Sequence, residues 1–383
     1  MSDLKPQPLS ALTSQFSLDL FQTLVKERPT GNVFISPLSI ASSLVMMLNG
    51  ASGDTYQAMA EVLRVADMSL SEINATYQDL LASLARTKGE EQVRLLTSLW
   101  GNRAVMFKAD FQQRASASFD AWLSSVDFDS LAIETKEAIN GWVSAKTNGL
   151  IERLVESVDP ATVLLLISVA AFKGKWDEPF KSQVTKPGQF ALPDGRQKPV
   201  QMMYLQQHQR YFEDENRQAV WLPYRSRLTG MLVILPREGV TLAKAAADLT
   251  AEHLAQWIDN YDSRPLNLWL PRFKVVFSRQ LNQALSDMGM SPAFDAGRAT
   301  FADLAVPSKG LFISDVYHEA VLRVCEEGTE AFAATILGLR MMGIDNRPPI
   351  DMRVNRPFLV AIADFDSMTL LFLGAINNPD NLT

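Results

Sequence analysis

The segment EEGTEAFAATILGLRMMG, residues 326–343, decides how the rest of the chain is interpreted. It follows an alternating stretch typical of a strand and opens with a run of small residues. Phe332, Ile336 and Leu339 recur at helical spacing, so periodicity alone favours a buried helix here. The flanking sequence must therefore decide between a helix and an extended segment.

Several motifs elsewhere favour the extended alternative. They are NVFISPLSIASSLVMMLNGASGDT (32–55), FKGKWDEPF (172–180), LWLPRF (268–273), VYHEAVL (316–322), VNRPFLVAIADF (354–365) and LFLGAINNP (371–379). With these motifs around it, EEGTEAFAAT resembles the hinge of the reactive loop in serpins. The resemblance extends over roughly residues 10–379, and the combination of motifs is specific to the family.

The resemblance implies an α+β fold: one large domain over residues 1–383, with helices packed on mixed β-sheets and an exposed reactive loop at about 326–349. In serpins this loop is bait for a protease, and its first half enters the main sheet as a new strand after cleavage. The implied function is therefore a suicide-substrate inhibitor of serine-type, and secondarily cysteine-type, endopeptidases. The implied hinge residues are Glu326, Gly328, Thr329, Glu330, Ala331, Phe332, Ala333 and Ala334.

An inserting strand must place alternate side chains in the sheet interior, because strand side chains alternate between faces. Counted as in the family, the inward residues are all small or uncharged, and the carboxylate of Glu330 and the ring of Phe332 point outward. This pattern is compatible with insertion. The inward residues are Thr329, Ala331, Ala333 and Thr335.

The usual spacing from the hinge glutamate places the cut between Met342 and Gly343. Methionine there suits elastase-, chymotrypsin- or subtilisin-like proteases. Two alternatives stay open: cleavage after Arg340 would attract trypsin-like enzymes, and cleavage after Met341 would attract the same apolar-pocket class as Met342. The segment after Gly343 is a few residues longer than is common in serpins.

Two further groups of residues match functional regions of the family. The first is the place where the main sheet opens, matched by Ser36, Ser39, Ser168 and His318. Ser168 stands where the family commonly has an asparagine partner for the histidine. The second is the point where the loop begins, matched by Trp176, Thr185 and Arg272, the last facing Glu326. We expect little stability from a surface pair between Arg272 and Glu326.

The composition is that of an ordinary globular protein. Of 383 residues, 47% are hydrophobic and 21% charged, and the net charge is −7 without a Lys/Arg cluster that would predict nucleic-acid binding. The single cysteine excludes an internal disulfide, and no apolar run approaches membrane-spanning length. We expect a monomer that has no cofactor, metal site or membrane contact and acts on a target protease.

The N-terminus MSDLKPQPLS lacks the apolar core of a secretory signal. The sequence therefore predicts an intracellular protein, or an extracellular one from which a signal has been trimmed. Residues 163–172 are predicted to form a strand that is buried on both faces.

The sequence disfavours three rival functions. Bulky or charged inward hinge residues would indicate a non-inhibitory serpin-fold protein, such as a carrier, a chaperone or a simple protease substrate. This hinge lacks them. An enzyme is disfavoured because His318 and Cys325 lie seven apart on one predicted strand and so face opposite ways. Activation by a polyanion is disfavoured because the predicted helix at 69–87 ends with only Arg86 and Lys88.

Local patterns predict where the regular elements lie. Ser36-Pro37 predicts a helix start, and Ser69-x-x-Glu72 a capping box. Pro193-Asp194-Gly195 predicts a turn. The predicted helices are 10–28, 36–49, 69–87, one over Ile139–Val143 that ends near 148, 250–259, and 279–288 stopped by Gly289; late strands are predicted through Trp221, at 231–235, 352–363 and 368–376.

Overall fold

The computed structural model describes residues 8–85, 91–254, 262–329, 347–364 and 369–382. Within these ranges the helices are α1 (Pro8–Glu27), α2 (Pro37–Leu48), α3 (Gly53–Val62), α4 (Leu70–Ala85), α5 (Ala109–Phe119), α6 (Ala132–Lys146), α7 (Leu242–Ala247) and α9 (Asn282–Leu285). Residues 251–254 are also helical. Short 3-10 or π turns cover Ser182–Val184, Ser286–Met290 and Ser291–Phe294.

Most of the strands in the described ranges form two large sheets. The main sheet contains β11 (Phe273–Gln280), β13 (Ile313–Cys325), β14 (Gly328–Thr329), β5 (Leu164–Lys175), β2 (Gln92–Asn102) and β4 (Trp122–Val126), in that order. The second sheet contains β1 (Val33–Ile35), β17 (Thr369–Ile376), β16 (Phe358–Asp364), β9 (Thr229–Pro236), β8 (Arg217–Pro223), β7 (Gln197–Glu213), β10 (Asp262–Pro271) and β15 (Ile350–Arg353), with β6 (Lys186–Ala191) on β7. A small pair joins β3 (Met106–Phe107) to β12 (Ala305–Val306).

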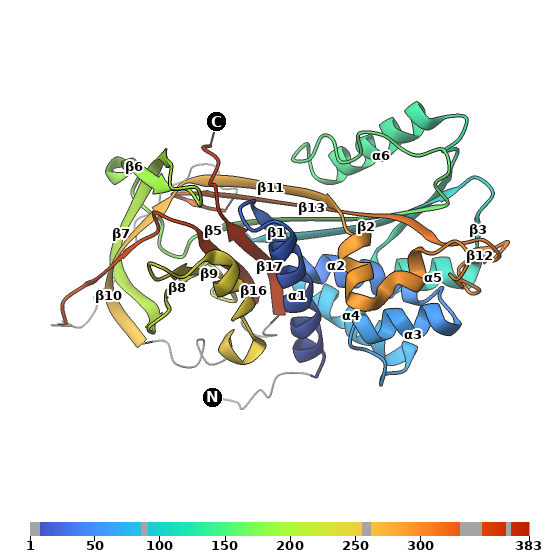
Figure 1. Ribbon diagram of the computed structural model, residues 1–383, viewed down its shortest axis with the longest axis horizontal. Coiled ribbons are helices and arrows are strands. Elements are labelled where there is room, and N and C mark those ends of the chain that lie inside the picture. Colours follow the sequence, from blue (N-terminus) through green and yellow to red (C-terminus); the bar gives the residue numbers. More distant parts are fainter. Residues whose placement is uncertain (1–7, 86–90, 255–261, 330–346, 365–368, 383) are drawn as a thin grey trace.

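The long strands of the main sheet run between two helical layers (Figure 1). Helix α6 lies over the outer face, where Ile139 and Val143 pack on Ile167 and Val169 of β5. Helix α2 lies beneath the opposite face, between the main sheet and β17 of the second sheet. Strand β5 is buried along nearly its whole length, which confirms the prediction for residues 163–172.

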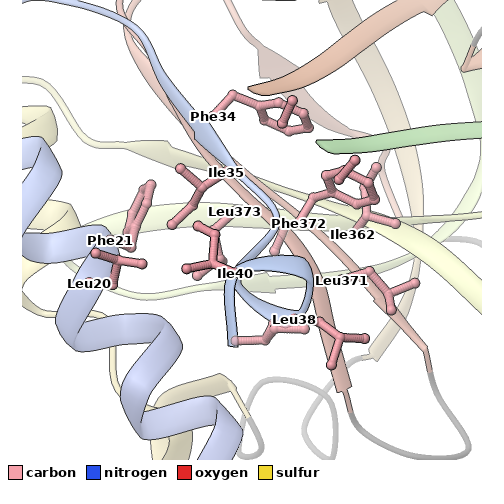
Figure 2. Close-up of a cluster of buried hydrophobic side chains, with 14 of the residues drawn as sticks. Leu20, Phe21, Phe34, Ile35, Leu38, Ile40, Ile362, Leu371, Phe372 and Leu373 are labelled. Carbon is pink, nitrogen blue, oxygen red and sulfur yellow. The ribbon is translucent and has the colours of Figure 1, made fainter. Parts of the chain in front are cut away.

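The core beneath the main sheet is built from segments distant in the sequence. Figure 2 shows side chains of α1, β1, α2, β16 and β17 meeting in one cluster. The rings of Phe34 and Phe372 stack with centroids 5.4 Å apart. Every residue of α2 is buried, so this helix is held rigidly under the sheet. This placement matters because α2 begins at Ser36, one of the predicted site residues.

Several local predictions are confirmed. Pro37 occupies the first turn of α2, and the Ser36 hydroxyl accepts a hydrogen bond from the Ser39 amide. The capping box at α4 forms, because the Glu72 carboxylate accepts the Ser69 amide at 2.9 Å. The predicted turn at 193–195 joins β6 to β7, with Gly195 at φ +84°.

Two predicted element boundaries are wrong. Residues 279 and 280 belong to strand β11, and the helix starts only at Asn282. The buried–exposed alternation that begins at Phe273 continues through Gln280, and pairing with β13 extends this strand at the expense of the helix. The predicted strand 352–363 is two strands, because the chain leaves β15 after Arg353 and re-enters a different part of the second sheet only after Pro357.

Candidate functional site

The main sheet contains a seam, which we define as the boundary between β13 and β5. These strands are parallel neighbours, paired from Ile313 and Leu164 to Val321 and Ala171. The outer neighbours of this pair, β11 and β2, are both antiparallel to it. An antiparallel strand entering the seam would therefore find a correctly oriented partner on each side.

Strand β14 already occupies the end of the seam next to Cys325 of β13 and Lys175 of β5. The chain turns tightly after Cys325, and Gly328 and Thr329 then pair with Cys325 and Val324 of β13. The same two residues pair with Lys175 and Gly174 of β5. The first two hinge residues that can form a strand are thus between β13 and β5 in the intact chain. Sequence reasoning had placed this pairing only after cleavage.

Gly328 is required by the closeness of this turn to β5. Its φ of +151° disfavours any side chain, and a Cβ atom there would lie 2.1 Å from the Gly174 carbonyl oxygen. The absence of a side chain at Gly328 therefore allows the hinge to lie against β5.

Thr329 faces the interior, as the alternation predicts. Its side chain is fully buried, and its hydroxyl lies 2.7 Å from the Tyr224 hydroxyl. Burial raises the pKa of Tyr224, so this phenol stays neutral and the two hydroxyls share one hydrogen bond. Tyr224 follows β8 of the second sheet, so the bond ties the hinge to the second sheet.

Trp176 holds the turn from the side. Its indole Nε1 donates to the Cys325 carbonyl at 3.0 Å, and its backbone amide donates to the Glu327 carbonyl at 3.0 Å. Its ring stacks on Tyr224 with centroids 4.7 Å apart and planes 8° apart. The Phe180 amide donates to the Glu326 carbonyl at 2.9 Å. The segment 176–180 therefore fixes the backbone from which the loop departs.

The Glu326 side chain is anchored by the other two residues matched to this region. The Thr185 hydroxyl donates to Glu326 Oε1 at 2.7 Å, and Arg272 Nε lies 3.3 Å from Oε2. The arginine contact is an ion pair without an aligned hydrogen bond, since Arg272 Nε has no hydrogen-bond partner. The expected surface pair is in fact half-buried, because the Glu326 side chain is 6% exposed and that of Arg272 35%.

His318 bridges the seam in the middle of the sheet, where it pairs with Ser168. The Ser36 amide donates to His318 Nε2 at 3.1 Å, so Nε2 carries no proton. The proton therefore resides on Nδ1, which faces the Ser168 carbonyl at 3.1 Å and the Ser168 hydroxyl at 3.2 Å. Burial lowers the pKa of His318 to about 3, while the bond to Ser168 raises it in part, so the ring is neutral at physiological pH.

The serines complete this cluster beneath the seam. Ser39 and Ser168 share a hydrogen bond with their hydroxyls 2.9 Å apart, and the Ser36 hydroxyl donates to the Leu371 carbonyl at 2.7 Å. The cluster therefore joins β5, β13, the start of α2 and β17. Ser168 reaches His318 despite being shorter than asparagine, because the two residues are direct cross-strand partners.

The remaining predicted residues lie outside the part of the chain that the structure describes. They are the proposed reactive bond between Met342 and Gly343, its alternatives Arg340 and Met341, and the hinge residues Glu330, Ala331, Phe332, Ala333 and Ala334. The structure adds Tyr224 and Phe180 to the site. Phe180 lies within the motif FKGKWDEPF, whereas nothing near Tyr224 in sequence pointed to the hinge.

The geometry gives no support to a His–Cys dyad. His318 faces α2, whereas Cys325, an odd number of residues along the same strand, lies on the opposite face, where its thiol donates to Glu327 Oε2 at 3.3 Å. Burial raises the pKa of this thiol, so the reactive thiolate is disfavoured. Among the described residues, no three His, Cys, Asp or Glu side chains gather as metal ligands would. The helices within the described ranges include none with the length and apolarity to cross a membrane.

This architecture, a large sheet with a hinge strand started in its seam, defines a class of proteins. The model of the serpin (serine protease inhibitor) family matches residues 11–379, and the chain belongs to that family. The leukocyte elastase inhibitor of Sus scrofa is 35% identical over 97% of this chain and 100% of its own length. Serpin B6 of Macaca fascicularis is 33% identical over 97% and 99%, and human antithrombin-III is 31% identical over 97% and 82%.

Solved structures agree with this assignment. The thermophilic serpin tengpin in its native state superposes with a TM-score of 0.89 at 28% identity, covering 99% of this chain and 96% of tengpin. Human thyroxine-binding globulin superposes with a TM-score of 0.90 at 26% identity, covering 97% and 98%. The predicted α+β serpin fold is thereby confirmed.

Proposed function

We propose that the protein inhibits serine proteases as a suicide substrate, by inserting its cleaved reactive loop into the seam between β13 and β5. The observation that carries this proposal is β14, because Gly328 and Thr329 are paired with both sides of the seam. The insertion needs no new nucleation, since the strand has already begun.

The pairing pattern makes further insertion favourable. Opening the seam breaks one parallel ladder, which is the less stable kind per residue, and the inserted strand forms two antiparallel ladders. The gain is realised only when the loop is cut, because an intact loop is tethered at its far end to β15. The intact fold is therefore held kinetically in a state that cleavage releases.

The register of β14 shows which residues the inward side chains would meet. Thr329 pairs with Val324 and Gly174, so Ala333 would lie between Ala320 and Ala170, a narrow and fully buried row. A small residue fits there. Thr335 would lie between His318 and Ser168, where its hydroxyl replaces Ser168 as the partner of His318 Nδ1.

The trap itself is mechanical. The protease nucleophile attacks the carbonyl carbon of residue 342, the amide bond to Gly343 breaks, and the new amine leaves with a proton. An ester, or a thioester for a cysteine protease, then joins the two proteins. Insertion of about 14 residues at about 3.3 Å each carries the bound protease roughly 45 Å. Distortion of its active site by about 1 Å slows deacylation on the order of a hundredfold.

The residue at the cleaved bond sets the target. Met342 favours elastase-, chymotrypsin- or subtilisin-like enzymes, and Arg340 would favour trypsin-like ones. The names of the Sus scrofa, Bos taurus and Equus caballus relatives, all leukocyte elastase inhibitors, support the first group. The chain supplies a scissile bond and stored free energy and performs no catalysis of its own. We propose that it acts as a monomer without nucleic acid, membrane or cofactor, either inside the cell or, after loss of a leader, outside it.

The rival function is a serpin-fold carrier or a simple protease substrate. Thyroxine-binding globulin shares this fold, so the fold alone does not distinguish the two functions. The hinge favours inhibition, because the buried Thr329 and the small inward residues that follow it suit a sheet interior.

The test is incubation with elastase, chymotrypsin, subtilisin and trypsin, followed by a denaturing gel and mass spectrometry of the released C-terminal peptide. Inhibition predicts a covalent band and a peptide covering residues 343–383. A peptide that begins at residue 341 or 342 would move the bond to Arg340 or Met341. Complete clipping by all four enzymes with no covalent band would establish the substrate function instead.

A further inference from the structure

A basic cavity of about 460 Å³ lies on the outer face of the main sheet, over the upper part of the seam. Each of four neighbouring strands contributes one cation to its lining: Lys274 from β11, Arg323 from β13, Lys173 from β5 and Arg94 from β2. These residues are far apart in the sequence, so no basic run revealed the cluster. The loop after α6 forms one wall, and Arg94 donates to the Lys146 carbonyl there at 3.3 Å.

The floor of the cavity is apolar. It contains Val321 and Ala171, which are direct partners across the seam, and Leu150 contributes to the wall. Cations flank this apolar floor, because Arg94 of β2 is the direct partner of Ala171. A volume in this range is that of an ordinary small-ligand pocket, about 300–1,000 Å³, so two side chains fit within it.

The cations lie at the fork of the seam, which is the point where β14 begins to separate β13 from β5. Val321 and Ala171 are paired directly, whereas Val324 and Gly174 are separated by Thr329 of β14. Arg323 and Lys173 lie between these two rows, facing each other across the fork. Lys274 is the direct partner of Arg323 on the other side. Arg323 and Lys274 are thus like charges directly opposite each other on neighbouring strands, and the Glu319 carboxyl also interacts electrostatically with Lys274.

The register of β14 identifies which residues of the inserted loop would meet the row. Thr329 is paired with Val324 and Gly174, so the next residue, Glu330, falls between Arg323 and Lys173. Because Thr329 points to the interior, Glu330 points to the outer face, where the cations are. Two residues further on, Phe332 falls between Val321 and Ala171, also on the outer face.

We propose that this cavity is the docking site for the Glu330 carboxylate and the Phe332 ring in the inserted state, so that it is a lock for the cleaved loop. The proposal rests on the proposed function, because it concerns the state in which the loop has inserted beyond Thr329. It also accounts for an acidic and an aromatic side chain at outward positions of a hinge that is otherwise built from small residues. The row of cations favours the inserted strand, because Glu330 would place an opposite charge between Arg323 and Lys173.

The test compares the intact protein with protein nicked in the loop, by guanidinium unfolding of each form. Lys173→Gln should destabilise the nicked form, because it removes a partner of Glu330. Glu330→Gln should destabilise the nicked form alone. Their double-mutant coupling should be about fivefold in the unfolding constant of the nicked form, the upper end for a half-exposed ion pair, and absent from the intact form.

Two further variants complete the design. Phe332→Ala should raise the unfolding constant of the nicked form at least tenfold, because insertion would bury the ring against Val321 and Ala171. Lys309→Gln is the matched control: this lysine is exposed and outside the cavity, so losing its charge should shift both forms equally or neither.

The outcomes separate this proposal from the proposed function. If nicking stabilises the protein but the Lys173–Glu330 coupling is below twofold, the docking site is wrong and the insertion mechanism stands. If nicking gives no stabilisation, insertion itself is refuted. If sodium tripolyphosphate stabilises the intact and nicked forms equally, the cavity remains open after insertion and a free anion is its occupant, which also overturns the proposal.

Discussion

Replacing Thr329 with arginine tests the mechanism at the residue where insertion begins. Thr329 is fully buried, and its hydroxyl shares its only described hydrogen bond with Tyr224. An arginine at this position would have to place its guanidinium beneath the sheet, among Tyr224, Phe172 and Trp176, whose aromatic rings pack on one another.

The two states of the protein should respond differently to this change. In the intact form β14 is only two residues long and can leave the sheet, so the loss is limited to the Tyr224 bond and its pairing, about 1–3 kcal/mol. In the inserted form the strand on both sides holds residue 329 in place. A buried unpaired charge then costs at least about 3–5 kcal/mol. If half of this cost is present in the insertion transition state, insertion slows by about tenfold or more.

The assay is the stoichiometry of inhibition against a protease that the parent protein traps. The parent should consume close to one inhibitor molecule per protease, whereas Thr329→Arg should consume about ten or more, with clipped inhibitor accumulating on a denaturing gel. Thr329→Ser is the matched control, because it keeps the hydroxyl and the small volume and should trap almost normally.

An unchanged stoichiometry for Thr329→Arg would refute insertion of residue 329 between β13 and β5. Equal impairment of Thr329→Ser, which keeps the hydroxyl and introduces no charge, would show that a buried charge is not the cause of the effect.

Three further predictions concern the turn and the ionisable groups of the seam. Gly328→Ala should destabilise the intact form by about 1–3 kcal/mol and expose the hinge to limited proteolysis, because its Cβ would lie 2.1 Å from the Gly174 oxygen; a normal proteolysis pattern would contradict the tight turn. Burial raises the pKa of Glu319 from 4.5 to about 7, so the stability contributed by its neutral form is present below pH 4.5 and is lost as the pH rises through 7. Glu319→Gln should remove this loss of up to about 3 kcal/mol, which urea titrations at pH 5 and pH 8 would measure. The pKa of His318 is instead lowered from 6.5 to about 3, so the intact form should lose up to about 1.4 kcal/mol per pH unit as pH falls from 6.5 toward 3, and His318→Gln should flatten that slope; an equal slope in the variant would assign the acid sensitivity to other groups.

The sequence predicted the features that depend on local chemistry or on direct neighbours along the chain. The Ser36 cap, the Ser69–Glu72 capping box and the turn at 193–195 each follow from a few side chains acting on nearby backbone. The pairing of Glu326 with Arg272 followed from the family resemblance, but the burial of Glu326 and its hydrogen bond from Thr185 did not, because both arise only in the folded chain.

What the sequence did not predict depends on register between distant strands. Gln280 is a strand residue because β13 pairs with it. The residues around Pro357 separate β15 from β16 because the two strands belong to different places in the second sheet. The pairing of β14 inside the seam was missed for the same reason. So was the row of Lys274, Arg323 and Lys173, which exists only because three strands align them.

The most direct test of the spring-loaded fold is to nick the loop with a catalytic amount of protease and compare the melting of intact and nicked protein, with the fragments kept together. Conversion of the parallel seam into two antiparallel ladders predicts a melting temperature for the nicked form tens of degrees above that of the intact form. A nicked form that melts at or below the intact protein would contradict the claim that cleavage releases stored free energy.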